Sequence, residues 1–361
     1  MLVSSWLLLE QADPAESSSP PYPPSQVIKG ITWDFSGLIR LAPGSDLWPT
    51  TWAADGNVYA SWGDGGGFGG TNDSGRVSLG FARIEGSPTS LTGRNVWGGY
   101  QAEHPATFEG KSAGMLSVDG TLYAWINTQN SSTPDIRLAW SSDLGATWQL
   151  STWKFASSTF APSVFLNFGK DNAGARDGYV YTYGGRWLTP SPVYLVRVPK
   201  AQIKSQSAYE YFAGLGAGRN PTWTPNVQQA KPVFADSSST DANGANHASV
   251  IYNPGIGRYI LTAPHGGAEQ LGIFDAPEPW GPWTTVAYYD NWGTFTGEGL
   301  LYFFPTKWIS ANGKTMWMVF SSTAVLDSFN LIKATLNVDG SVTSPPSPDL
   351  PYSVYLSPIY K

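Results

Sequence analysis

Two aspartates flank one expected β-hairpin at positions where paired carboxylates could do acid–base chemistry. The segment TTWAADGNVYASWGD is centred on Asp55-Gly56, and Asp-Gly between alternating apolar residues is a strong signal for a tight hairpin turn. Reflection about Asp55 places Asp46 opposite Asp64. Cross-strand neighbours have Cβ atoms about 4.5–5.5 Å apart, and like charges at that spacing are destabilising. The pair therefore suits a retaining glycosidase, in which one carboxylate attacks the anomeric carbon and the other protonates the leaving oxygen. The alternative is that both aspartates only cap turns.

Three histidines offer a second kind of chemistry. Reflection about Ile256 pairs His247 with His265, and His104 lies in the loop that enters the second repeat. Imidazole at such places can bind a substrate or act as a base, and the alternative is surface histidines in Gly-rich loops. The three lack metal-ligand spacing, so no metal site is predicted.

Five copies of one pattern position these residues: an apolar strand, a Gly turn, and a strand rich in Tyr, Trp and Val. The turns lie at Asp55-Gly56, Asp119-Gly120, Asp177-Gly178, Gly255–Gly257 and Asn312-Gly313, and a third strand follows each of them. Repeats of this kind predict an all-β fold, a five-bladed β-propeller. We expect one propeller domain over residues 28–361, behind a signal remnant or Ser/Pro-rich leader over residues 1–27. A two-sheet sandwich is the structural alternative, and the only helix expected lies around residues 200–215.

Propeller geometry adds further candidates to the two aspartates. Residues before the first strand and after the second strand of each blade surround the central channel on one face. The substrate-binding candidates found in this way are Trp48, His104, Lys111, Arg186, His247, His265 and Glu298. Charged groups beside an aromatic ring that can stack on sugars fit a polar, hydroxyl-rich ligand.

Composition excludes several classes of function. The 361 residues carry 21 Lys plus Arg and 27 Asp plus Glu, so the net charge of −6 disfavours a nucleic-acid partner. The absence of Cys excludes disulfides and a Cys nucleophile, and no apolar run approaches the ~18 residues of a membrane span. No cofactor is expected. The run Gly65–Gly70 fits G-x-G-x-x-G but joins two strands, so it is not a dinucleotide fingerprint. The segment 141–148 matches the Asp-box turn of sialidases and related propellers, which is structural.

Several motifs together resemble a known family. Ser45-Asp46, Asp55-Gly56 and Gly63-Asp64, with the five hairpins and the segment GIFDAPEPWGPWT at 272–284, are similar to a large family of mostly uncharacterised bacterial and fungal five-bladed propellers. That family includes the endo-D-arabinanases, and the resemblance covers most of residues 28–340. It implies a glycoside hydrolase with Asp64 as nucleophile and Asp46 as acid/base. The Gly run after Asp64 and the two facing histidines depart from the arabinanase members, which leaves D-arabinan itself open.

Two other functions fit the same residues. In a polysaccharide lyase acting on rhamnose and uronate linkages, His247 or His265 would be the base, and Arg186 or Lys111 would neutralise the uronate. A glycan-binding propeller without catalysis would need the aromatic residues and not the carboxylates. We predict a secreted, monomeric polysaccharide hydrolase whose only partner is its polysaccharide or oligosaccharide substrate, with no nucleic acid and no membrane.

Overall fold

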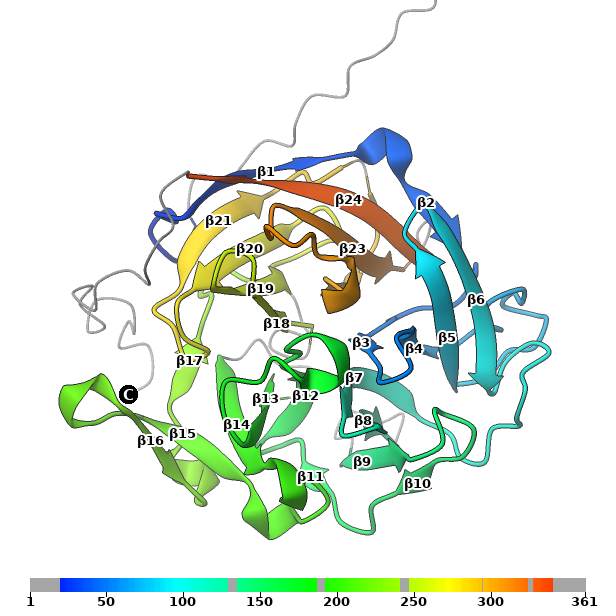
Figure 1. Cartoon of the computed structure of the whole chain (residues 1–361), viewed down its shortest axis with the longest axis horizontal. Coiled ribbons are helices and arrows are strands. Elements are labelled where there is room, and N and C mark those ends of the chain that lie inside the picture. The colour runs from blue at the N-terminus through cyan, green and yellow to red at the C-terminus, as the bar shows by residue number, and fades with distance from the viewer. Residues whose placement is uncertain are drawn as a thin grey trace, which may run out of the picture.

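Five small antiparallel sheets follow one another around a ring (Figure 1). The structure is a computed structural model that describes residues 20–128, 135–186, 192–240, 247–293, 295–323 and 327–339. Each sheet is one blade, so the predicted five-bladed β-propeller is confirmed and the sandwich is excluded. In the described part of the chain, no helix is long and apolar enough to span a bilayer.

The first two blades are built in chain order. Blade 1 contains β3 (Thr50–Trp52), β4 (Val58–Gly63), β5 (Leu79–Ser87) and β6 (Ser90–Trp97), and blade 2 contains β7 (Lys111–Val118), β8 (Thr121–Asn127) and β9 (Asp135–Ser141), with β10 (Gln149–Leu150) and β11 (Phe155–Ala156) both paired to β9.

Blades 3 and 4 continue the same order. Blade 3 contains β12 (Ala161–Phe165), β13 (Tyr179–Gly185), β14 (Val193–Pro199), β15 (Glu210–Leu215) and β16 (Pro221–Thr224), with β17 (Pro232–Phe234) paired to β14, and blade 4 contains β18 (Ser249–Asn253), β19 (Arg258–Pro264), β20 (Leu271–Ala276) and β21 (Thr284–Tyr289).

Blade 5 joins the two ends of the described chain. It contains β22 (Gly299–Phe303), β23 (Thr315–Ser322) and β24 (Phe329–Val338), and its outer strands β1 (Ile28–Trp33) and β2 (Ile39–Leu41) come from the N-terminal side. Trp33 in β1 lies opposite Ala334 in β24. Its indole Nε1 donates to the hydroxyl of Tyr289 over 3.2 Å, and its ring packs edge-on against Trp292. The ring of blades is therefore closed by strand pairing, as Figure 1 shows for β1 and β24.

The folded part begins before residue 28, the boundary expected from the sequence. Tyr22 is buried, and its hydroxyl accepts a hydrogen bond from the backbone N–H of Ala235 over 2.8 Å. Pro24 forms a parallel bridge with Thr285 in blade 4. Residues 20–27 thus pack against the propeller, while residues 1–19 of the expected leader lie outside the described residues.

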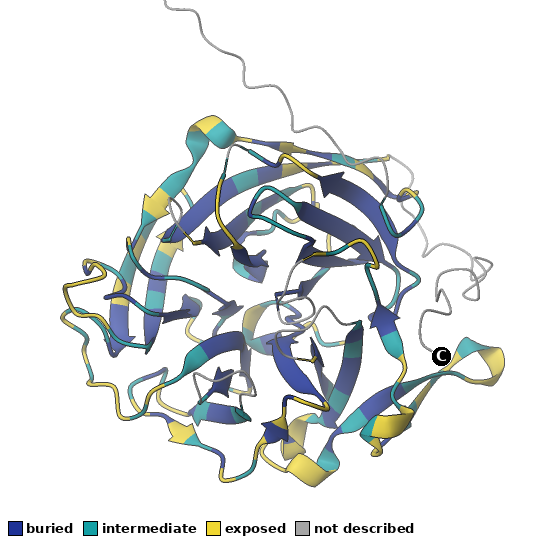
Figure 2. Cartoon of the chain, turned by 180° about the vertical axis from the view of Figure 1, so that it is seen from behind, coloured by how far each residue is buried: buried dark blue, intermediate teal, exposed yellow. Residues whose placement is uncertain are grey.

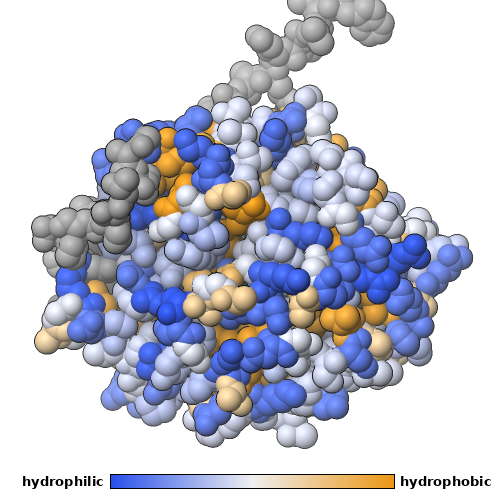
Figure 3. Space-filling view, viewed as in Figure 1, coloured by the Kyte–Doolittle hydropathy of each residue, from blue (hydrophilic) through white to orange (hydrophobic). Residues whose placement is uncertain are grey.

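Apolar burial runs along the strands of every blade. All six residues of β4 and all five of β12 are buried. Exposed residues gather in the loops and at the outer rim (Figure 2). Figure 3 shows apolar side chains in separate patches among hydrophilic ones on the face seen there. Aromatic side chains fill the space between blades, where large rings such as Trp62, Trp97 and Trp125 are fully buried.

The prediction of a helix around residues 200–215 is wrong. The segment forms two short 3-10 turns, η3 (Lys200–Gln202) and η4 (Gln206–Ala208), and then strand β15. Ile203, Tyr209 and Tyr211 are buried in the core of blades 2 and 3, and the last two are two residues apart, which is the strand period. Packing of those rings outweighs the helical preference of the segment.

Candidate functional site

The two aspartates of the first hairpin lie at the same end of blade 1, one register step away from the predicted pairing. β3 and β4 pair as expected, with Thr50 opposite Ala60. Asp46 faces Gly63, not Asp64, and the two exchange backbone hydrogen bonds of 3.0 Å. Four steps separate 46 from 50, but only three separate 60 from 63, so the first strand carries one extra residue. That bulge contains Leu47 and Trp48, whose φ angles of 74° and 59° are left-handed.

The carboxyl group of Asp46 is shielded from water and incompletely hydrogen-bonded. The residue is half-buried, and its Oδ1 is shielded from solvent without a hydrogen-bond partner. Burial raises the pKa of Asp46 to about 7, the nearby Lys111 ammonium works against that rise, and the charges of Asp64 and Asp327 add to it. A carboxyl group with a pKa of about 7 can donate a proton at neutral pH and take it back, as a general acid/base requires.

Asp64 sits between two cations from different blades. It forms ion pairs with Lys111, the first residue of β7 in blade 2, and with Arg76, whose Nη2 lies 3.3 Å from Oδ1. The backbone of Asp64 is left-handed, with φ of 51°, a conformation that Asp tolerates better than most residues. The two partners fix the direction of the carboxylate.

The segment that carries Asp46 is held from both neighbouring sides. The Ser45 hydroxyl accepts a hydrogen bond from Gly67 N over 2.9 Å, which ties it to the Gly-rich loop of blade 1. On the other side, Leu47 N donates to the Ser321 hydroxyl of blade 5 over 2.9 Å, and Gly44 N donates to the Asp327 carbonyl over 2.7 Å. Burial also raises the pKa of Asp327, Asn72 opposes that rise, and the Asp64 charge adds to it.

The Gly-rich loop after Asp64, residues 65–78, has a compact fold that differs from that of a dinucleotide-binding loop. It joins β4 to β5 without opening a helix, as expected from the sequence. A Cβ on Gly66 would lie 2.1 Å from Ser74 O, so the loop closes on itself only with glycine there. The buried Asn95 of β6 organises it: Nδ2 donates to the carbonyls of Gly66, Phe68 and Tyr100, and Oδ1 accepts from Phe68 N.

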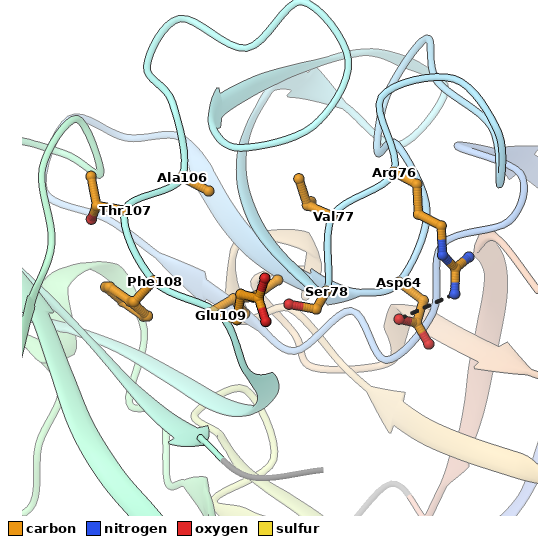
Figure 4. Close-up of a pocket in the computed structure, with 9 residues that line it drawn as sticks. Asp64, Arg76, Val77, Ser78, Ala106, Thr107, Phe108 and Glu109 are labelled. Atoms are coloured by element: carbon orange, nitrogen blue, oxygen red, sulfur yellow. Dashed lines mark ion pairs between the residues drawn. The ribbon is translucent and has the colours of Figure 1, made fainter.

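A pocket of about 520 Å³ opens beside Asp64, between the Gly-rich loop and the connection into blade 2 (Figure 4). In Figure 4, Glu109 and Ser78 point toward one another between Phe108 and Asp64. The residues that line the pocket are Asp64, Arg76, Val77, Ser78, Leu79, Ala106, Thr107, Phe108 and Glu109. Of the two aspartates only Asp64 lines it, and Asp46 pairs with Gly63, the residue before Asp64.

Most of the residues that line the pocket were not predicted as site residues from the sequence. Residues 106–109 end one residue before the inner strand β7, so the rule that selected Lys111 could also have selected Glu109. Arg76 lies in the loop between β4 and β5, and Asp327 lies in the equivalent loop between β23 and β24. Neither residue directly follows the second strand of its blade, so the rule based on strand ends did not select them.

The prediction that Trp48 binds substrate is wrong. Its side chain is fully buried, its ring stacks on Trp62 with centroids 5.4 Å apart, and Nε1 donates to Ser45 O over 2.8 Å. The left-handed backbone of the bulge directs the ring into the core between blades 1 and 5. Trp48 therefore offers no ring face to a sugar.

The histidines are not brought together at the pocket. His247 Nδ1 lies 3.1 Å from Gly299 O of blade 5, whereas His265 Nε2 lies 3.0 Å from Tyr289 O of its own blade. Both are buried, and each nitrogen donates its proton, because a carbonyl only accepts. The prediction that His247 faces His265 is wrong by one register step. That prediction would pair Ser249 with Ala263, but Ser249 pairs with Thr262 because the intervening turn holds an extra residue. His104 is half-buried and bridges to Trp97 at the outer strand of blade 1.

The two remaining candidates lie at the expected end of their blades. Arg186 directly follows β13 and Glu298 directly precedes β22, and both are exposed. Neither lines the pocket beside Asp64. Among the residues that the structure describes, no group of three His, Cys, Asp or Glu side chains is placed to hold a metal ion.

Comparison with known proteins identifies a family. The family described as "Domain of unknown function (DUF4185)" matches residues 113–358, about two thirds of the chain. The chain belongs to this family. The DUF4185 match begins after Asp46 and Asp64, so membership does not by itself assign those residues. It agrees with the resemblance to a family of mostly uncharacterised five-bladed propellers.

Solved structures are similar to this DUF4185 chain at low identity. The structure titled "RS223-Beta-xylosidase" has a TM-score of 0.51 at 11% identity, covering 84% of this chain and 95% of that one. A GH43_1 enzyme from Xanthomonas citri has a TM-score of 0.47 at 11% identity, covering 84% and 94%. A thermostable family-43 glycoside hydrolase has a TM-score of 0.44 at 13% identity, covering 84% and 95%. No curated protein matches the chain.

Proposed function

We propose that this protein is a retaining glycoside hydrolase that cleaves a polysaccharide with Asp46 as acid/base and Asp64 as nucleophile. The observation that carries the proposal is the pairing of a half-buried carboxyl group whose pKa is about 7 with a cation-held carboxylate that lines an open pocket. Different environments for two neighbouring carboxyl groups are what acid and nucleophile roles require. The RS223 β-xylosidase, which shares the fold, is a glycosidase by name, and this agrees with the proposal.

The reaction would run in two steps. Asp46 donates its proton to the glycosidic oxygen while a carboxylate oxygen of Asp64 bonds to the anomeric carbon, and the C–O bond to the leaving sugar breaks. Asp46, now deprotonated, takes a proton from water, whose oxygen displaces Asp64 from the sugar. Retaining enzymes keep their carboxyl groups about 5–5.5 Å apart. Asp46 pairs with Gly63, the residue before Asp64, so the proposed mechanism requires the two carboxyl groups to reach that separation on one bound sugar.

Lys111 and Arg76 would serve the nucleophile and not the substrate. Both form ion pairs with Asp64, so their charge is already directed at a carboxylate of the protein. The charges of Asp46, Asp64 and Asp327 act on one another here, and Glu109 lines the same pocket as Asp64 and Arg76. A uronate would add another negative charge to this set, so we propose an uncharged, arabinan-like or related glycan as substrate.

The experiment compares wild type, Asp46→Asn and Asp64→Asn on D-arabinan, L-arabinan, arabinogalactan, gum arabic and ulvan. Reducing ends and the ultraviolet absorbance of unsaturated uronate are read together, and the anomeric configuration of the first product is read by proton NMR. We expect reducing ends without absorbance, retention of configuration, and loss of turnover by at least about a hundredfold in both variants. Asp73→Asn, the same change at an exposed position of the Gly-rich loop, is the matched control. Absorbance with reducing ends would instead establish elimination.

A further inference from the structure

The pocket beside Asp64 extends well beyond a single carboxylate. Its walls come from two separate segments, residues 76–79 of blade 1 and residues 106–109 in the connection to blade 2. Its volume of about 520 Å³ lies within the range of about 300–1,000 Å³ typical of small-molecule sites. There is room here for more of a glycan than the bond that is cut.

Phe108 forms an apolar wall of the pocket, and packing against a core residue holds its ring in position. The ring is half-buried and lies against the fully buried Trp97, with ring centroids 4.9 Å apart and planes inclined by 47°. Because one side packs on the core, the ring loses little further freedom when a ligand covers its other side. A sugar presents C–H groups that can stack on such a face.

Ser78 and Glu109 supply hydrogen-bonding groups opposite one another. The Ser78 hydroxyl accepts a hydrogen bond from Gly110 N over 3.3 Å, so its own proton is directed elsewhere. Glu109 is exposed, and no residue in the described part of the chain forms an ion pair with it. An ionised carboxylate accepts two hydrogen bonds at once, and two neighbouring hydroxyls of one sugar provide them.

We infer that Phe108, Ser78 and Glu109 form a subsite that binds one uncharged sugar residue of the glycan next to the residue held at Asp64. Phe108 stacks on the sugar ring, and Glu109 and Ser78 bind its hydroxyls. This inference names a binding site within the proposed function and rests on it. The expected ligand carries no carboxylate, since Arg76, the cation that lines the pocket, is paired with Asp64, as is Lys111.

The test measures glycan binding separately from catalysis. Native gels containing L-arabinan, D-arabinan, arabinogalactan or polygalacturonate, run in the cold, give apparent dissociation constants from retardation. We compare wild type, Phe108→Ala, Phe108→Leu, Glu109→Gln and the control Glu103→Gln. Glu103 is an exposed residue in the same connection, and its side chain pairs with Arg83. Phe108→Leu keeps an apolar side chain without the aromatic face, and melting curves check that every variant is folded.

We expect retardation by at least one uncharged glycan and none by polygalacturonate. Binding should weaken about tenfold in Phe108→Ala, Phe108→Leu and Glu109→Gln, and it should be unchanged in Glu103→Gln. Wild-type binding in folded Phe108 and Glu109 variants would overturn the subsite, as would retardation by polygalacturonate alone or by none of the glycans. Reducing-end release by the same proteins separates the two claims. If the wild type hydrolyses a glycan but the Phe108 and Glu109 variants bind it as the wild type does, only the subsite is refuted. If those variants bind more weakly but no protein hydrolyses the glycan, only the proposed hydrolase activity is refuted.

Discussion

Lys111 and Asp64 form an ion pair that joins the inner strand of blade 2 to the end of the first hairpin in blade 1. The Lys111 stem also lies against Gly63, where an added Cβ would be 3.3 Å from Lys Cδ. The same ammonium opposes the rise in the pKa of Asp46. One cation is therefore coupled to both carboxyl groups of the proposed mechanism.

The pH profile of the reaction should report this coupling. An acid with a pKa of about 7 loses its proton above that pH, so kcat/KM should fall as pH rises through about 7. Lys111→Met removes a charge that lowers the pKa of Asp46, so the alkaline limb should move to higher pH, and Lys111→Arg should leave it near the wild-type position. Rate measurements from pH 4 to 10 decide this. An alkaline limb at the same pH in wild type and Lys111→Met would contradict the coupling.

The stability of the fold should also depend on Asp46. Its folded pKa of about 7 lies above the ordinary value of 3.8, so the native state binds more protons than the unfolded chain between those two values. The contribution of Asp46 to the free energy of unfolding therefore falls as pH rises from about 4 to about 7. Asp46→Asn removes that dependence and should be more stable than wild type at pH 8. Guanidinium unfolding at pH 5 and pH 8 measures the difference, and a less stable Asp46→Asn at pH 8 would refute it.

Asn95 should be essential for the Gly-rich loop. Asn95→Ala removes four hydrogen bonds and leaves the carbonyls of Gly66, Phe68 and Tyr100 without that donor. We expect a loss of about 3 kcal/mol in the free energy of unfolding, because unsatisfied buried groups cost about 1–3 kcal/mol each and loop movement relieves some of them. Urea unfolding gives the value.

The control for that variant is Asn226→Ala, which removes an exposed N-cap. Asn226 Oδ1 accepts from Gln228 N over 3.0 Å, and the loss of such a cap typically costs about 1 kcal/mol. Equal effects of the two substitutions would show that Asn95 has no special role in the loop.

A buried ion pair in blade 4 should be far more important than the exposed ones. Arg258 Nε donates to Asp275 Oδ2 over 2.7 Å, and the two side chains are 4% and 0% exposed. Asp275→Asn leaves the guanidinium without its buried counter-charge and should cost about 3–5 kcal/mol, as single-partner removal from buried pairs does. Asp119→Asn, which breaks the exposed pair with Lys200, should cost less than about 1 kcal/mol. Similar losses in the two variants would contradict the difference in burial.

The blade pattern was predictable because each blade carries its own local signal. Asp119-Gly120 forms the two-residue turn between β7 and β8, with Val118 opposite Thr121. Asp177-Gly178 is not such a turn, because thirteen residues lie between the end of β12 at Phe165 and the start of β13 at Tyr179. There the Asp177 carboxylate accepts from Tyr179 N over 3.0 Å, so the same dipeptide starts a strand at the end of a long loop.

The candidate site was predictable only as far as strand ends define it. Asp46 and Asp64 were found from hairpin symmetry, and Lys111 was found because it lies at the start of an inner strand. The bulge at Leu47 and Trp48 could not be foreseen, since it depends on packing of Trp48 against Trp62. The Gly-rich loop is likewise shaped by distant hydrogen bonds, so the place of Arg76 beside Asp64 had no sequence signal.

The central claim is that Asp64 is the residue that attacks the glycan. The most direct measurement is reducing-end release and uronate absorbance from the five-glycan panel by wild type, Asp64→Asn and Asp73→Asn at pH 6. We predict reducing ends without absorbance from at least one uncharged glycan, unchanged in Asp73→Asn and lost in folded Asp64→Asn. Full activity of Asp64→Asn, or absorbance that accompanies every cleavage, would contradict the account.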